Sequence, residues 1–296
     1  MKNFFHVKNL KEFVGIKMML KILREPLTGK ELYLKTNIEV LKLWKLCKLS
    51  DEIEIKSVAT HYLRLERKIP QYARFSPSIQ REFITYSVIG LKGDEKIDKK
   101  SKELKNKIIE ISSNKFKIAE KFVSSFSNEA CFIIAGDVAL NMAHSEPREE
   151  KSTGELVNGS DLDIVAITLD NFDISRLDKE MHIKKYVYLK TYKEEVDYIV
   201  KPLSKVEKQA KFESFEDMVA CKILNEGKFL YGNVEIFKEV KKILKKNKIP
   251  KKIKNLEKKA KKFREKAEKI LLSKDKISKK EYDLYFSTTQ EFSEIF

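Results

Sequence analysis

The chain has few cysteines, few histidines and no recognisable zinc motif. Its three cysteines, Cys47, Cys131 and Cys221, are far apart, odd in number and set in apolar surroundings, which argues against a disulfide framework. We expect them to be reduced, buried thiols, as in a cytosolic protein. The four histidines are scattered without metal-ligand spacing, so neither residue type predicts a zinc site.

Long apolar segments are also lacking. No apolar run approaches the ~18–20 residues that a bilayer-spanning helix needs. Residues 1–8 carry a charge where a signal peptide needs an unbroken apolar stretch. Six prolines and an apolar content of 42% are atypical of a disordered chain. The sequence therefore predicts a folded, cytoplasmic protein without membrane association, and its 296 residues are enough for about two domains.

Positive charge is abundant but local. The formal net charge is +16, and residues 241–280 alone contain 19 Lys or Arg against 4 Asp or Glu. Apolar residues recur there at helical spacing, with lysines around the rest of the helix: Ile253, Leu256, Ala260, Phe263, Ala267 and Ile270. The segment is either a solvated helix packed on its domain or a platform for phosphate groups. A membrane-surface helix is less consistent with it, because bulky aromatic anchors are few.

Apolar periodicity and turn residues divide the chain into four segments of an α+β protein. Residues 1–68 contain three helical patterns and then a pair of strand-like pieces, an order that resembles a winged-helix domain but also fits a structural cap. Residues 69–101 are a turn-rich connector. Residues 102–240 are expected to form a core with a short mixed sheet and helices. Residues 241–296 are the basic, helical C-terminal region.

Three pieces of the core carry residues that point to chemistry. A short apolar strand ends at Gly136 and a helix follows, so backbone N–H groups there could approach a phosphate. Asp161 and Asp163 are two residues apart at the start of a second apolar strand, so both carboxylates leave one face. Asp197 lies in a later apolar strand, and pairing of the two strands would complete a cluster of three carboxylates. Such hard oxygen ligands suit Mg²⁺.

In this order, the strand and helix around Gly136, the run Ser160-Asp161-Leu162-Asp163 and the later Asp197 resemble the nucleotidyltransferase superfamily of DNA polymerase β. That superfamily includes tRNA nucleotidyltransferases, antibiotic nucleotidyltransferases and abortive-infection toxins. The resemblance covers about residues 115–240, and residues 216–232 look like the helix and turn that close several small members. It implies that Asp161 and Asp163 hold two Mg²⁺ ions and that Asp197 assists the base or one metal. It also implies that Gly136 and Ser160 lie at the triphosphate of a nucleoside triphosphate.

The implied activity is transfer of a nucleoside monophosphate from the triphosphate to an acceptor hydroxyl. The basic C-terminal region and the winged-helix-like segment favour a nucleic-acid acceptor. RNA, such as a tRNA 3′ end, is the first expectation, and DNA is possible through the winged helix. Two alternatives remain open: a toxin that nucleotidylylates proteins, and a non-catalytic DNA-binding regulator with a vestigial transferase fold.

Three features near the expected site depart from the family pattern or allow two interpretations. Asp137 stands where the family usually has glycine or serine, and its charge would repel a triphosphate unless it turns away as a helix cap. The polar insert at residues 144–158 is expected to be a flexible loop. Lys222 either neutralises a phosphate or is an ordinary lysine on the surface of a helix.

Overall fold

The computed structural model describes residues 10–150 and 152–288. The N-terminal residues 1–8, on which the prediction about a signal peptide rests, lie outside this range, as do the ends of the first and last predicted segments. The described chain is a mixed α+β structure, as predicted. It divides into two compact units that are discontinuous in sequence. The first unit contains residues 10–61, 77–107 and 264–288, and the second contains residues 62–76 and 108–263.

The first unit consists of helices around a small antiparallel sheet of order β1-β5-β2. Its complete elements are α1 (Leu10–Ile22), β1 (Leu27–Thr28), α2 (Gly29–Thr36), α3 (Val40–Leu49), β2 (Ile53–Ser57), α4 (Ile79–Thr85), β5 (Ser87–Leu91), α12 (Lys279–Glu281) and η2 (Tyr282–Phe286). The predicted helix cap at Thr28 is confirmed. Its hydroxyl accepts from the Glu31 N–H at 3.2 Å, and the Glu31 carboxylate accepts from the Thr28 N–H at 2.7 Å. This reciprocal pair is a capping box, which satisfies two donors at the start of α2.

The two strand-like pieces that follow α3 do not pair with each other, contrary to the expected strand pair. Instead, β2 pairs with β5, and β3 (Tyr62–Leu65) pairs with β4 (Ala73–Ser76) in the second unit. The reason is that β5 contains the fully buried Val88 and Ile89 and occupies the centre of the sheet, between β1 and β2. A strand buried on both sides is the more favourable partner for the amphipathic β2.

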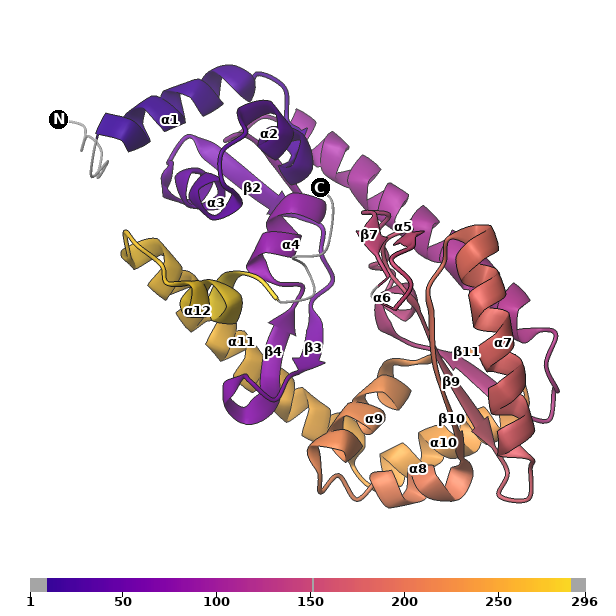
Figure 1. The fold of residues 1–296 in the computed structure, drawn as a ribbon. Coiled ribbons are helices and arrows are strands. Elements are labelled where there is room, and N and C mark those ends of the chain that lie inside the picture. Colours follow the sequence, from indigo (N-terminus) through magenta and orange to yellow (C-terminus); the bar gives the residue numbers. More distant parts are fainter. Residues whose placement is uncertain (1–9, 151, 289–296) are drawn as a thin grey trace. The chain divides into compact units, whose positions relative to one another are not determined.

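The second unit is built on a four-stranded sheet of order β10-β9-β6-β11, in which β9 and β10 are parallel and the other pairs antiparallel (Figure 1). Its elements are β3, η1 (Pro70–Tyr72), β4, β6 (Cys131–Ile134), α6 (Gly136–Ala139), β7 (Arg148–Glu149), β8 (Leu156–Val157), β9 (Leu162–Thr168), α7 (Ile174–Tyr192), β10 (Val196–Pro202), α8 (Leu203–Gln209), α9 (Phe215–Glu226), β11 (Lys228–Gly232) and α10 (Val234–Lys246). A parallel pair needs a long crossover, which α7 supplies between β9 and β10.

Alternate residues of the sheet supply two separate apolar cores. Phe132, Ile134, Ile164 and Ala166 face one core with α7 and the second half of α5 (Lys96–Val123). Cys131, Ile133, Val165 and Ile167 face the other core with α8, α9, α10 and α11 (Ile249–Ser273). The sheet thus lies between α7 on one side and α8 and α10 on the other (Figure 1). A strand covered on both faces reads as a continuous apolar run, which is the pattern that predicted these strands.

The two longest helices, α5 and α11, each pass from one unit to the other. The predicted apolar face of α11 is confirmed, because Ile253, Ala260 and Ala267 are buried while the lysines between them are mostly exposed. Both helices are rich in charge, and in the described part of the chain no helix is long and apolar enough to cross a membrane. The three cysteines are buried and free, as predicted.

Candidate metal centre

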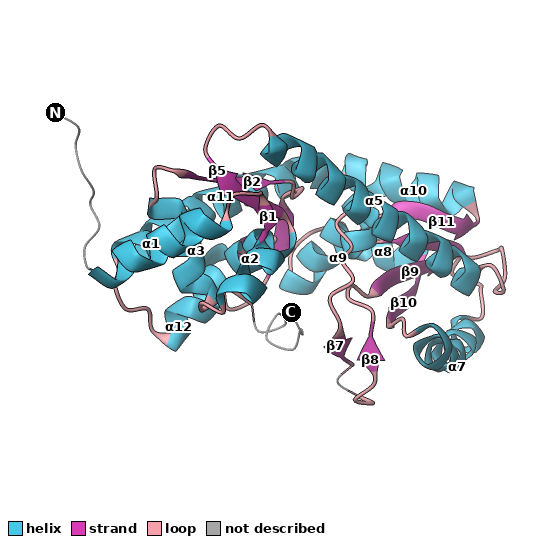
Figure 2. Ribbon diagram, turned by 90° about the horizontal axis from the view of Figure 1, so that it is seen from above, coloured by secondary structure: helices cyan, strands magenta, loops and turns pink. Residues whose placement is uncertain are grey.

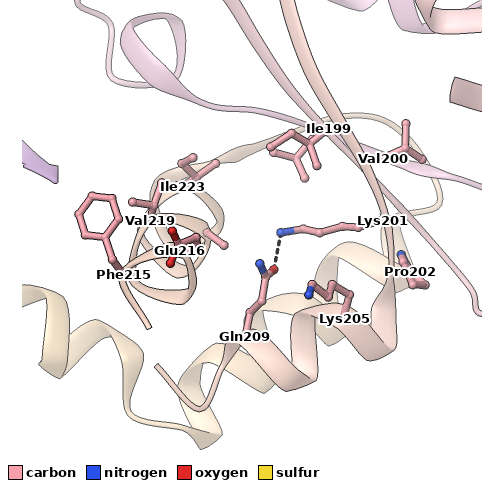
Figure 3. Close-up of a pocket in the computed structure, with 12 residues that line it drawn as sticks. Ile199, Val200, Lys201, Pro202, Lys205, Gln209, Phe215, Glu216, Val219 and Ile223 are labelled. Atoms are coloured by element: carbon pink, nitrogen blue, oxygen red, sulfur yellow. Dashed lines mark hydrogen bonds between the residues drawn. The ribbon is translucent and has the colours of Figure 1, made fainter. Parts of the chain in front are cut away.

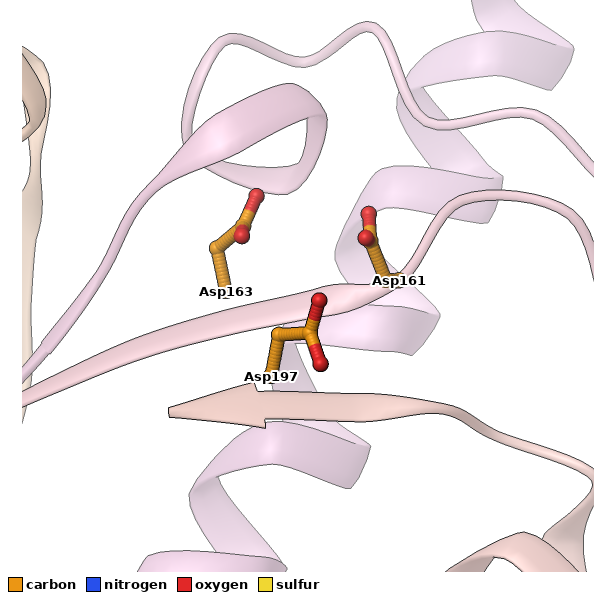
Figure 4. A group of neighbouring side chains, drawn as sticks. All are labelled: Asp161, Asp163 and Asp197. Atoms are coloured by element: carbon orange, nitrogen blue, oxygen red, sulfur yellow. The ribbon is translucent and has the colours of Figure 1, made fainter. Parts of the chain in front are cut away.

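The parallel pairing of β9 and β10 brings the three predicted carboxylates together. Asp163 in β9 is directly opposite Asp197 in β10, and Asp161 immediately precedes β9. One carboxylate oxygen from each residue lies within 4.8 Å of the others, and all three side chains point to the same region (Figure 4). One cation could therefore contact all three residues. Asp197 is exposed, whereas Asp161 and Asp163 are half-buried, so the cluster is open to solvent on the β10 side.

Crowding of negative charge destabilises the ionised form of this cluster. Burial is the largest cause that raises the pKa of Asp161, and together with the nearby carboxylates of Asp137, Asp197 and Glu195, and against the opposing charge of Arg148, it brings that pKa to about 6. Burial together with the carboxylates of Asp161, Asp137 and Asp197 also holds the pKa of Asp163 well above its usual range. A divalent cation between the carboxylates would remove this repulsion, so the charge distribution fits a metal site.

Gly136 provides the space into which the Asp163 carboxylate fits. Its backbone has a positive φ of 60°, a region that residues with a Cβ rarely adopt. A Cβ at this position would lie only 1.9 Å from Oδ2 of Asp163. In this structure the glycine is therefore required for the conformation of a cluster carboxylate. The sequence predicted a different contact for it, with a triphosphate.

Asp137 and Ser160 form one hydrogen-bonded group beside the cluster. The Asp137 carboxylate accepts hydrogen bonds from the Tyr62 hydroxyl at 3.0 Å and from the Ser160 hydroxyl at 3.1 Å. Ser160 is buried, and its oxygen also accepts from the His144 N–H at 3.2 Å. The Ser160 hydroxyl thus donates its proton to Asp137. The Asp137 carboxylate is held by the Tyr62 and Ser160 hydroxyls, and Asp137 is not a helix cap. Its negative charge nevertheless remains near the cluster, as the raised pKa of Asp161 reflects.

The insert between Gly136 and Asp161, which its polar composition predicted to be a flexible loop, contains regular structure in its described residues. It contains the hairpin of β7 and β8, which projects from the unit in Figure 2. At its base, Arg148 is buried and forms an ion pair with Glu195 at 2.5 Å. Its guanidinium also lies 3.9 Å from the Asp161 carboxylate and donates from Nε to the Gly159 carbonyl at 3.1 Å. Arg148 therefore partly neutralises the charge of Asp161.

Two further cations flank the cluster. Lys115 of α5 is buried and pairs with Glu194, the residue just before β10 begins. Lys222 of α9 pairs with Glu226 at 2.8 Å, and its ammonium lies 5.1 Å from the centre of the Tyr62 ring. Lys222 also partly opposes the rise in the pKa of Asp163. It is thus half-buried near the carboxylates, with a partner of its own.

Sequence patterns identified the carboxylates but not Arg148 or Lys115. A single arginine in a polar insert gives no local signal, since its role depends on the distant Glu195. Lys115 lies on the same helical face as the buried Ile108 and Phe122, seven residues away on either side, but this position does not indicate the distant Glu194 as its partner. Comparisons with protein-family models, with curated proteins and with solved structures found no match to this chain.

Proposed function

We propose that this protein is a cytoplasmic, metal-dependent nucleotidyltransferase with a polymerase β-type core, which transfers a nucleoside monophosphate from a nucleoside triphosphate to an acceptor hydroxyl. The observation that carries the proposal is the convergence of Asp161, Asp163 and Asp197, each with a carboxylate oxygen within 4.8 Å of the others. Two of these carboxylates lie on adjacent parallel strands beside a glycine turn. This is the arrangement that the resemblance to that superfamily implies.

Each residue of the site has a distinct task under this proposal. Asp161 and Asp163 would hold Mg²⁺, and the more exposed Asp197 would share a metal or accept the proton of the attacking hydroxyl. Bound Mg²⁺ supplies charge neutralisation for the triphosphate and lowers the pKa of the attacking hydroxyl. Gly136 keeps room for the Asp163 carboxylate. The Tyr62 and Ser160 hydroxyls donate hydrogen bonds to the Asp137 carboxylate and hold it in place.

The charge distribution favours a nucleic-acid acceptor, and the acceptor that we propose is RNA. Exposed lysines follow one another along α11 on the side opposite its buried residues: Lys251, Lys254, Lys258, Lys261 and Lys262. A row of ammonium groups attracts a phosphate backbone without reading its sequence, and such binding weakens as salt increases. A DNA-binding role for the first unit is less favoured, because the strand pair expected to follow its helices does not form.

Incubation with a nucleoside triphosphate labelled at the α-phosphate tests this proposal. The protein, Mg²⁺ and total RNA should give labelled RNA, whereas a γ-phosphate label should leave as pyrophosphate because the bond between the α- and β-phosphates breaks. All four nucleotides are used, with lysate protein as a parallel acceptor. If only protein is labelled, the acceptor is a protein and not RNA. If neither RNA nor protein is labelled with any of the four nucleotides, in Mg²⁺ or in Mn²⁺, the result contradicts transferase activity.

A further inference from the structure

A pocket of about 570 Å³ lies between β10, α8 and α9 in the second unit. Its walls are mainly apolar and include Val165, Ile199, Val219 and Ile223, with the Phe215 ring at one end (Figure 3). This volume lies within the range found for sites that bind small organic molecules. The pocket therefore has the size and the lining to enclose a compact apolar group.

Lys201 extends from β10 into this apolar pocket (Figure 3). Lys201 is 7% exposed, and its ammonium donates one hydrogen bond, to the side-chain oxygen of Gln209 at 2.8 Å. An ammonium group has three protons to donate, and buried charges in proteins are usually paired. Within the described part of the chain, no carboxylate forms an ion pair with Lys201.

Among the described residues Lys115 is the other buried lysine, and it has an ion-pair partner, which Lys201 lacks. Lys115 has a similar burial, but it pairs directly with the carboxylate of Glu194. Burying a charge beside only a neutral amide is costly, and an anion that reached the pocket would offset that cost. Lys201 and the exposed Lys205 make the pocket positive, while Glu216 is its acidic lining residue.

We propose that this pocket binds a small molecule that has an apolar body and a single carboxylate, with the carboxylate paired to the Lys201 ammonium. The apolar body would contact Val219, Ile223 and Phe215, and the carboxylate would take the two protons that Gln209 leaves free. This binding site is independent of the proposed transferase activity. It also lies on β10 beyond the carboxylate cluster, because Ile199 is two residues after Asp197 on the same face of the strand.

The protonation state of Lys201 makes binding depend on pH. The pKa of Lys201 is lowered to about 8, mainly by burial and to a smaller extent by Lys205, while the Cys221 thiol opposes the decrease. Glu216 is the carboxylate of the pocket lining. Because only the ammonium form attracts a carboxylate, affinity should fall about tenfold from pH 7 to pH 9. A site formed by apolar contacts alone would show no such change.

Titration calorimetry with octanoate and octanol on the full chain tests this proposal. Octanoate should bind the wild type at least about tenfold more tightly than octanol, since the two differ only in the charged head group. Lys201→Met should remove that preference and the pH dependence while leaving octanol binding unchanged. The matched control Lys205→Met changes an exposed charge and should alter the affinity for octanoate by less than about threefold.

A second variant separates loss of binding from loss of structure. Ala220→Leu adds bulk to the lining without touching a charge, and it should weaken octanoate and octanol alike. Thermal unfolding of each variant verifies that it is folded. Equal affinities of the wild type for octanoate and octanol, no binding of either compound, or undiminished octanoate binding by folded Lys201→Met would each overturn the proposal.

Discussion

Replacing Asp161 and Asp163 together by asparagine is expected to lower the rate of nucleotidyl transfer by at least about 10³-fold. Asparagine keeps the shape of the side chain but removes the negative charge that would hold a divalent cation, so the electrostatic stabilisation of the transition state is lost. Transfer of the α-phosphate label to RNA measures the effect. The matched control is Asp275→Asn, which removes an equivalent charge from an exposed position and should leave the rate unchanged.

The same double variant is expected to be more stable than the wild type in buffer without divalent cations. Burial raises the pKa of Asp161 from 3.8 to about 6, so the folded state binds its proton more tightly than the unfolded state does. Ionisation of Asp161 therefore lowers the free energy of unfolding of the wild type. This decrease is absent below pH 4, grows as the pH rises towards 6 and is complete above pH 6. Its size is at most about 3 kcal/mol for Asp161, at 1.36 kcal/mol per pKa unit.

Urea unfolding at pH 4 and pH 7 measures this difference. The free energy of unfolding of the double variant should exceed that of the wild type at pH 7 but not at pH 4, and Mg²⁺ should narrow the gap by stabilising only the wild type. A variant that is inactive but also less stable at pH 7 would mean that the carboxylates are structural. In that case the loss of activity would say nothing about metal binding.

Gly136→Ala is expected to lower the transfer rate by about 10²-fold, the second largest effect. The new Cβ would lie 1.9 Å from Oδ2 of Asp163, so either the carboxylate or the turn must move. A displacement of about 1 Å at a catalytic group is enough for a loss of that size. The positive φ adds a backbone cost of about 1–2 kcal/mol to folding.

Gly154→Ala is the matched control, because Gly154 also has a positive φ, of 70°, but no atom lies within 4 Å of the position of its Cβ. It should show the backbone cost in thermal unfolding and retain the wild-type transfer rate. If Gly136→Ala lost no more activity than Gly154→Ala, the close approach to Asp163 would be irrelevant to function.

The sequence predicted the core of the site because its signals are local. Asp161, Asp163 and Asp197 each interrupt an apolar run at the start of a strand, and the strand period determines the face on which they lie. The helix cap at Thr28 and the apolar face of α11 were predictable for the same reason. Each of these local signals depends on residues only a few positions apart, whereas the convergence of Asp197 with Asp161 and Asp163 also needed the expected pairing of β9 with β10.

Features that depend on distant partners were not predictable. Pairing of β2 with β5 joins segments separated by a helix and another strand pair, and no local pattern of β2 selects that partner. The units are discontinuous because residues 62–76 belong to the second unit and because α5 and α11 each contribute residues to both units, whereas composition divides the chain only in linear order. The partners of the buried Arg148 are Glu195 and the Gly159 carbonyl, which are distant in sequence, so its polar surroundings alone indicated a loop.

The most direct test of a metal centre at Asp161, Asp163 and Asp197 is a crystal structure with Mn²⁺ and a non-hydrolysable nucleoside triphosphate, with the ion located by anomalous scattering. We expect Mn²⁺ at about 2.0–2.2 Å from carboxylate oxygens of Asp161 and Asp163, with Asp197 contacting the same ion directly or through water. The triphosphate should contact the ion from the side of Gly136. Carboxylates without bound metal at millimolar Mn²⁺ in a folded protein would contradict the account.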